Sequence, residues 1–328
     1  MSDYAELKRR VAARGLFEPQ PRFYIFTAAT TLALVAGAFT LLFVSQSLAT
    51  DVVAAALLAI GSSHLGFLLH DIAHRQLVPA GRWADALQLL TGPLLLGLSG
   101  AWWKDKHDRH HAHPNDAERD PDIQIGFLAF SDEQARQKRG LSRYVVRYQA
   151  QLIVPLLFLE GFHLRAAGVK FLATTRTRFR RTELALLAVH AVCYSTAIVA
   201  AVGPLRAILV IGVHQGLFGL YAGTVFAPNH KGMPIIGPTS TLTYLERQVV
   251  TARNVRGHPV TDWWYGGLNY QIEHHLFPTL PRNRLHDAQT IVRSFCADHG
   301  VPYCETTLWR SYRAVFASLH DTGRPAHG

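Results

Sequence analysis

The sequence predicts an all-α integral membrane protein, with four transmembrane helices in two hairpins and a cytosolic helical cap. Three observations lead to this fold class. The 328-residue chain is 49% hydrophobic and only 17% charged, whereas about 25% charged residues is usual for a soluble domain. Four uncharged stretches approach or exceed the length of about 20 residues that a membrane-spanning helix needs. The basic residues lie almost entirely on one side of these stretches, as cytoplasmic segments do.

The four expected spans contain no Asp, Glu, Lys or Arg. They cover residues 23–48, 52–69, 184–205 and 207–229. Short turns join the first span to the second and the third to the fourth, so each pair forms a helical hairpin.

Two further apolar stretches compete for the same role. Residues 86–103 are interrupted by Gly92-Pro93, and residues 148–162 contain Pro155. With four spans, 32 of the 33 basic residues fall on one side of the membrane; if both extra stretches crossed, nine basic residues would move outside. Because basic residues concentrate on the cytoplasmic side, we expect re-entrant or interfacial elements here, with both termini in the cytosol.

We expect one domain of residues 1–328. Its cytosolic cap would comprise residues 70–183 and 230–321, followed by a disordered tail of residues 322–328. Three cysteines without a disulfide or metal pattern favour a reducing cytosolic face. The N-terminal segment is polar and basic, so no cleavable signal peptide is expected. The net charge of +10, on so apolar a chain, favours anionic lipid headgroups or an acidic acyl carrier over nucleic acid as a partner.

Histidines form three clusters just outside the apolar stretches. These clusters are His70-x-x-x-His74, His107-x-x-His110-His111 and Gln271-x-x-His274-His275. Residues three and four apart lie on one face of an α-helix, so each cluster presents its side chains in one direction. Neutral imidazole is a common metal ligand, and seven convergent imidazoles exceed what one ion needs. The clusters predict two metal ions beside the membrane.

The predicted topology brings an eighth imidazole, His230, to the same membrane face. Gln271 has the right position, but its neutral amide is a poor ligand. A capping or solvated role is the alternative for His70 and His74, and His113 points off the face of the second cluster. Ligand type does not single out iron over zinc, because imidazole-rich sites accept several first-row metals.

The three clusters, in this order, resemble the histidine boxes of the membrane fatty acid desaturase family. His-Asp-Ile-Ala-His at 70–74 is similar to its first box, the histidines of 107–111 to its second and Gln-Ile-Glu-His-His at 271–275 to its third. Glutamine at the start of the third box is typical of the front-end subgroup. The segments Thr-Ala-Arg-Asn-Val at 251–255 and Leu-Pro-Arg at 280–282 also fit that subgroup.

The resemblance implies a di-iron centre that activates dioxygen and removes two hydrogens from adjacent methylenes of an acyl chain. It assigns eight ligands: His70, His74, His107, His110, His111, His230, His274 and His275. Some family members use an asparagine as a water-mediated ligand where this chain has Phe226, and Asn229 is the adjacent candidate for that role. No fused cytochrome domain is recognised, so we expect electrons from a separate ferredoxin, or from a cytochrome with its reductase.

Four residues that flank the boxes are candidates for lining an apolar tunnel for the acyl chain: Trp102, Trp103, Asn115 and Tyr270. The tryptophans could equally belong to an interfacial aromatic belt, and Asn115 could cap a turn. Ligating imidazoles usually donate their other N–H to a carboxylate or carbonyl. Asp71, Asp108 and Glu273 are candidates for that role, each towards a histidine of another box.

Two other functions remain open on the sequence. A hydroxylase or epoxidase acting on a lipid or a carotenoid would use the same metal centre with a different substrate placement. A haem-binding electron-transfer protein would need ligands at mid-membrane depth, where only His64, His190 and His214 lie, and it would leave the three histidine clusters unexplained.

Overall fold

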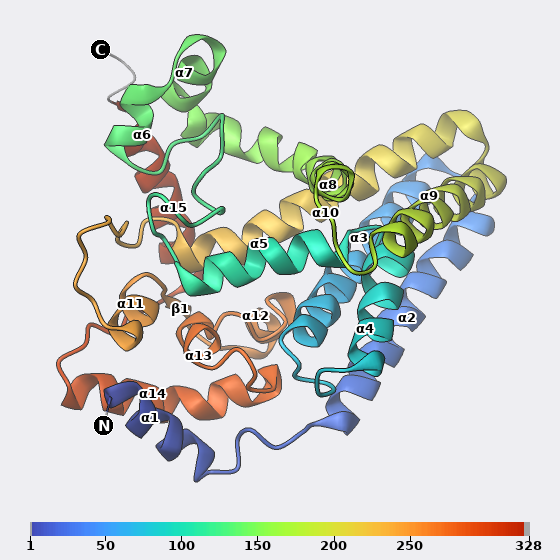
Figure 1. Ribbon diagram of the computed structural model, residues 1–328. Helices are drawn as coiled ribbons and strands as arrows, with labels where there is room; N and C mark the ends of the chain where they lie inside the picture. Colours follow the sequence, from blue (N-terminus) through green and yellow to red (C-terminus); the bar gives the residue numbers. More distant parts are fainter. Residues whose placement is uncertain (1, 325–328) are drawn as a thin grey trace. The chain divides into compact units, whose positions relative to one another are not determined.

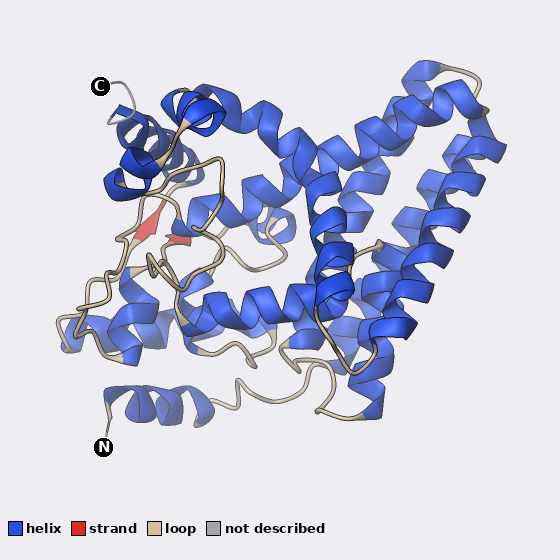
Figure 2. Cartoon of the chain, turned by 45° about the horizontal axis from the view of Figure 1, so that its top comes forward, coloured by secondary structure: helices blue, strands red, loops and turns tan. Residues whose placement is uncertain are grey.

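The chain is mostly helical, as predicted, in the computed structural model, which describes residues 2–324 (Figures 1 and 2). It divides into two compact units. Unit 1 comprises Met1–Glu18, Lys106–Ile153 and Thr224–Gly328, and unit 2 comprises Pro19–Asp105 and Val154–Gly223. The prediction of a single domain stays a prediction, and the units are described separately.

Unit 2 contains most of the apolar helices. Its complete elements are α2 (Pro21–Phe43), α3 (Leu48–Ala73), α4 (Arg82–Leu89), the π-helix η1 (Leu90–Leu96) and α9 (Arg180–Val202). Three more helices contribute to both units: α5 (Gly100–Ala112), α8 (Gln149–Thr174) and α10 (Pro204–His230). Most residues of α3 are buried, whereas few residues of α2 and α9 are, as is typical of helices surrounded by lipid.

Each predicted span coincides with a helix, but the ends differ from the prediction. The first helix stops at Phe43 instead of residue 48, because Ser47 begins the next one by accepting a hydrogen bond from the Thr50 amide. Gly203, at φ 78°, separates α9 from α10. A positive φ of this kind costs little when the residue is glycine. The two predicted hairpins are present.

A fifth helix, α8, is also long and apolar enough to cross a membrane. It packs tightly on α10: a Cβ atom at Gly161 would lie 2.3 Å from the Gln215 carbonyl oxygen, and one at Gly219 would lie 2.3 Å from that of Leu157. Small residues permit such close crossings of membrane helices. The four-span topology therefore stays a prediction, with α8 as the competing span.

The stretch at 86–103, expected to be re-entrant or interfacial, is not one continuous helix. It is divided among α4, η1 and α5, with Pro93 inside the π-helix and Gly97 at φ 71° after it. It is not among the five candidate spans of the described chain. The glycines and the proline that interrupt this stretch account for the break, because proline removes a helical hydrogen bond.

One ion pair ties the turns of the two hairpins together. The Arg206 side chain donates to Asp51 Oδ2 at 2.6 Å and to Ser45 Oγ at 3.1 Å. Asp51 is fully buried, so its carboxylate depends on this partner for compensation. Arg206, the one basic residue that the sequence places in an outer turn, therefore has a structural role.

Unit 1 consists mainly of short elements and carries the second and third histidine clusters and His230. Its complete elements are α1 (Asp3–Ala12), α6 (Asp132–Gln137), α7 (Gly140–Arg147), α11 (Tyr244–Val250), β1 (Asn254–Val255), α12 (Pro259–Trp264), α13 (Gln271–Leu276), the 3-10 helix η2 (Arg282–Arg284), α14 (Leu285–Asp298), β2 (Glu305–Thr306) and α15 (Leu308–Gly323). β1 and β2 pair in parallel. Apolar residues of α1, α11, α13 and α14 form its core.

The predicted disordered tail begins too early. Thr322 and Gly323 belong to α15 and are buried. Gly323 approaches the preceding part of unit 1 so closely that a Cβ atom there would lie 2.8 Å from the Val146 carbonyl oxygen. The rest of the predicted tail, residues 325–328, lies outside the described residues.

The Asp51–Arg206 pair leads to a test of the hairpin connection. Arg206→Ala leaves a buried carboxylate without its cation, so we expect a lower melting temperature, by an amount that solvent around the partly exposed Arg206 keeps small. Thermal unfolding in detergent measures it. The double variant Asp51→Asn/Arg206→Ala should recover part of the loss. An unchanged melting temperature in Arg206→Ala would exclude this role.

Candidate metal centre

The second histidine cluster lies on α5, whose beginning is held in unit 2. Ser99 Oγ accepts a hydrogen bond from the Trp102 amide and donates to Glu183 Oε2 at 2.6 Å. Glu183 also accepts from the Ala101 amide at 3.1 Å. A carboxylate at a helix N-terminus satisfies free amides and the helix dipole. The start of the helix that carries His107, His110 and His111 is thus anchored.

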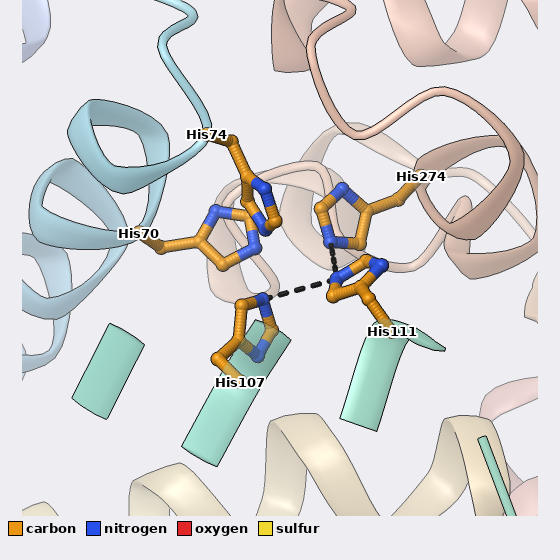
Figure 3. A group of neighbouring side chains, drawn as sticks. All are labelled: His70, His74, His107, His111 and His274. Atoms are coloured by element: carbon orange, nitrogen blue, oxygen red, sulfur yellow. Dashed lines mark hydrogen bonds between the residues drawn. The ribbon is translucent and has the colours of Figure 1, made fainter. Parts of the chain in front are cut away.

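In unit 1, the first group of imidazoles comprises His107, His111 and His274. His111 Nε2 lies 3.0 Å from His107 Nε2 and 3.0 Å from His274 Nε2, along the dashed lines of Figure 3. All three residues offer a nitrogen within 4.8 Å of the others. Lone-pair nitrogens that face one another are the arrangement that a shared cation requires.

The second group comprises His110, His230 and His275, and every ring is buried. His275 Nε2 lies 3.1 Å from His230 Nε2. The His110 ring centroid is 4.7 Å from that of His230 and 5.0 Å from that of His275. Three segments far apart in the sequence thus bring their imidazoles to one point.

In the second group the outer ring nitrogens have partners of their own. His110 Nδ1 lies 3.0 Å from both oxygens of Asp120, His230 Nδ1 lies 3.1 Å from the Thr251 carbonyl oxygen, and His275 Nδ1 lies 2.9 Å from Gln248 Oε1. Each partner accepts a hydrogen bond, so the proton belongs on Nδ1 and the Nε2 lone pair is left for a metal. The sequence alone does not indicate these three partners, because no helical spacing relates them to the histidines.

Burial keeps the third-box histidine neutral. Burial, and then the neighbouring rings of His111 and His230, lower the pKa of His275 well below its usual value. The ring is therefore neutral at pH 7, which is the form that binds metals. Neutral, inward-facing Nε2 atoms are what a metal centre needs, so the residues present fit one.

In unit 2, His70 and His74 lie at the end of α3. Their ring centroids are 4.6 Å apart, and both residues are buried; Figure 3 draws both side chains. His70 Nδ1 lies 3.1 Å from Asp71 Oδ1. Asp71 was expected to serve a histidine of another box, but it contacts its own neighbour. The Trp103 ring lies 5.7 Å from that of His70.

The structure places Gln271 beside His230, but the amide nitrogen of Gln271, and not its oxygen, faces the imidazole. Asn229 Nδ2 donates to the Leu268 carbonyl oxygen at 3.0 Å and to Gln271 Oε1 at 3.1 Å. The Leu268 carbonyl oxygen can only accept, so it must face the amide nitrogen of Asn229. The same nitrogen donates to Gln271 Oε1, which leaves Gln271 Nε2 on the side of His230, 3.1 Å from its Nε2. Ligation by Gln271 would require its amide to turn over. Asn229 Oδ1 is buried without a hydrogen-bond partner among the described residues.

Two of the candidate substrate residues have structural contacts in unit 1. Asn115, at φ 52°, donates to the carbonyl oxygens of His230, Pro234 and Thr251. Tyr270 precedes α13 and donates to Asp262 Oδ2 at 3.3 Å. In unit 2, Trp102 is almost fully buried. A substrate contact by any of these residues, or by Trp103, stays a prediction.

Glu273 has no direct histidine contact among those that the structure gives. It is fully buried and accepts hydrogen bonds from Asn254 Nδ2 at 2.6 Å and Tyr303 Oη at 2.8 Å. Burial raises the pKa of Glu273 to about 7, although both hydrogen bonds oppose the shift. This carboxyl therefore ties α13 to β1 and to the segment before β2.

Close to Asp120, a second carboxylate, that of Asp122, is surrounded by basic side chains. Burial would raise the pKa of Asp122, but Lys106, His110 and Lys231 outweigh it and hold that pKa below its usual range. Asp122 Oδ2 lies 3.5 Å from His110 Nδ1 and Asp122 also pairs with Lys106. His110 therefore has two carboxylates on the side away from the other imidazoles.

Substitution of Asp120 tests its contact with His110. Asp120→Ala removes the acceptor for the His110 Nδ1 hydrogen, and we expect metal affinity to fall about 10–100-fold. Asp120→Asn keeps one acceptor oxygen and should lose less. Metal content of the purified protein, with chelator competition, measures both. The exposed Asp132→Ala is the control; equal losses in it and in Asp120→Ala would refute a specific role.

Comparisons with known proteins agree with this geometry. A family model described as fatty acid desaturase matches residues 47–307. An acyl-lipid (9-3)-desaturase of Physcomitrium patens is 26% identical, over 99% of this chain and 63% of its own length. A Delta(8)-fatty-acid desaturase of Euglena gracilis is 30% identical (97% of this chain, 80% of its own), and a Delta(6)-fatty-acid desaturase of Caenorhabditis elegans is 29% identical (98% and 75%). The predicted resemblance to front-end desaturases is thereby confirmed, and the chain belongs to the fatty acid desaturase family, whose members are membrane oxidoreductases.

Proposed function

We propose that this desaturase introduces a cis double bond into an acyl chain held at the membrane, using dioxygen and electrons from a separate protein. The observation that carries the proposal is the pair of imidazole groups in unit 1, whose Nε2 atoms face one another. No amino-acid side chain removes hydrogen from an unactivated methylene, so this reaction requires a redox cofactor.

We assign one metal ion to each group. His110, His230 and His275 would hold one ion, and His107, His111 and His274 would hold the other. Three imidazoles leave an ion short of its usual coordination, so further ligands are expected. The family resemblance assigns these six histidines as ligands, and it adds His70 and His74 of unit 2.

Iron is the metal that suits the reaction. Two iron ions held by these residues would supply the dioxygen chemistry of the desaturation, whereas zinc, which accepts the same ligands, has no redox chemistry. The chain itself fixes the positions of the imidazoles and excludes bulk water, since the rings of the second group are buried. Trp103, in contact with His70, is a candidate wall of the acyl site.

The membrane arrangement supports a cytoplasmic active site. Among the described residues, five helices are long and apolar enough to span a bilayer, as expected of a multi-pass membrane protein. In the four-span topology, 32 of 33 basic residues share the side of the histidines, as the positive-inside rule expects for the cytoplasm. This basic surface suits an acidic electron donor, a ferredoxin or a cytochrome.

Substitution of the central ligands tests the assignment. His111→Ala and His275→Ala each remove one imidazole from one group, so we expect desaturation to fall at least about 100-fold, beyond the loss for an outer contact. Fatty acid profiles of cells that express the chain with a donor and its reductase measure this. His113→Ala is the matched control, because His113 belongs to neither group, and it should retain activity.

The same profiles test the reaction type. New double bonds in the acyl chains are the expected product, and metal analysis should find two ions per wild-type chain. Hydroxylated chains without new double bonds would contradict desaturation. Full turnover and metal content in either His111→Ala or His275→Ala would contradict the ligand assignment.

A further inference from the structure

A buried glutamine on α11 contacts two histidine boxes at once. Gln248 is fully buried. Its Nε2 donates to the His111 carbonyl oxygen at 2.9 Å, and its Oε1 lies 2.9 Å from His275 Nδ1. Both ends of one short side chain are therefore used, one by box 2 and the other by box 3.

The contact with His111 determines how the amide is oriented. A backbone carbonyl can only accept a hydrogen bond, so the amide nitrogen must face His111 and the oxygen must face His275. The oxygen in turn can only accept, so His275 carries its proton on Nδ1. The Nε2 atom of His275 is then free of hydrogen and available to a metal ion. One backbone carbonyl thus determines the tautomer of a ring in another segment.

The two histidines that Gln248 connects belong to different imidazole groups. His111 lies in the first group and His275 in the second. Their rings stack with centroids 4.4 Å apart and an interplanar angle of 22°. Gln248 is therefore placed to fix the separation of the two groups as well as the tautomer of one ligand.

The helix that carries Gln248 is itself rigidly held. Thr243 and Glu246 form a reciprocal capping box at its beginning. Leu245 and Val249 are buried in the core of unit 1. Tyr244, from the same helix, donates to the His275 carbonyl oxygen at 3.2 Å. A glutamine on such a support transmits its position to the rings that it contacts.

We propose that Gln248 is a positioning residue of the metal centre: it sets the ligating tautomer of His275 and links one ligand of each ion. This inference rests on the proposed function, because it requires that both groups hold metal. It predicts that the neutral amide is needed as donor and acceptor together, and that a side chain offering only one of these keeps only one of the two effects.

Two variants separate the two effects. Gln248→Leu removes donor and acceptor, and we expect metal affinity to fall about 10–100-fold, as for other outer contacts of metal ligands. Gln248→Glu still accepts from His275 Nδ1 but sets an oxygen against the His111 carbonyl. It should retain most of the affinity while the Mössbauer signals of the iron pair shift, because the link between the groups is lost.

Gln149 provides a matched control in the same unit. It is also a fully buried glutamine with both amide ends engaged: it accepts from the Ala129 amide and donates to the Ala129 and Leu319 carbonyl oxygens. None of these partners belongs to an imidazole group. Gln149→Leu should lower the thermal unfolding temperature as Gln248→Leu does, yet leave metal affinity and the Mössbauer spectrum unchanged.

The measurements use purified full-length chain in detergent, with iron and zinc as probes and a competing chelator. The inference is overturned if Gln248→Leu binds both ions as wild type does, or if Gln149→Leu loses as much metal. It also fails if Gln248→Glu loses as much affinity as Gln248→Leu, because the tautomer would then not depend on the acceptor. A wild-type chain that binds no pair of ions overturns the proposed function too, whereas a two-ion wild type with an unaffected Gln248→Leu overturns this inference alone.

Discussion

The structure of unit 1 depends on a constraint of proton placement: several buried imidazoles must turn unprotonated nitrogens towards one another. Crowded rings in a dry environment cannot all be charged, and burial with neighbouring rings does lower the pKa of His275. A neutral ring still carries one proton, which must go to the outer nitrogen. The carboxylate of Asp120, the carbonyl of Thr251 and the amide oxygen of Gln248 accept hydrogen bonds from those outer N–H groups, so the outer partners determine which nitrogens face inward.

Contacts with the surrounding fold supply the stability that the short helix α13 lacks on its own. A six-residue helix is not stable alone, and every residue of α13 is buried. Its beginning is tied through Glu273 to Asn254 and Tyr303, and near its end the Leu276 carbonyl oxygen accepts from Tyr4 of α1. The N-terminal helix therefore takes part in placing the third box, although it is some 270 residues away in sequence.

Local spacing in the sequence was enough to predict the boxes and the hairpins, because both depend on helical periodicity and on the length of apolar stretches. It could not predict Asp120 or Gln248, which reach their histidines through loops and tertiary packing. Nor could it predict that Ser47 ends the first hairpin turn, or that Gly323 is buried in α15. The tail prediction failed because composition indicates disorder only where no tertiary partner exists, and Val146 provides one.

Helical geometry explains why two of the boxes end in a histidine pair. Consecutive residues on an α-helix point about 100° apart, so His110 and His111 cannot direct their rings at one ion. In the structure His111 joins His107 in the first group while His110 joins the second, and His274 and His275 divide in the same way. The expectation that each cluster faces one direction is therefore too simple for these boxes. A histidine pair on a helix can therefore contribute to two imidazole groups, and two such pairs fit the binuclear centre that we propose, because a single ion would leave half of the rings unused.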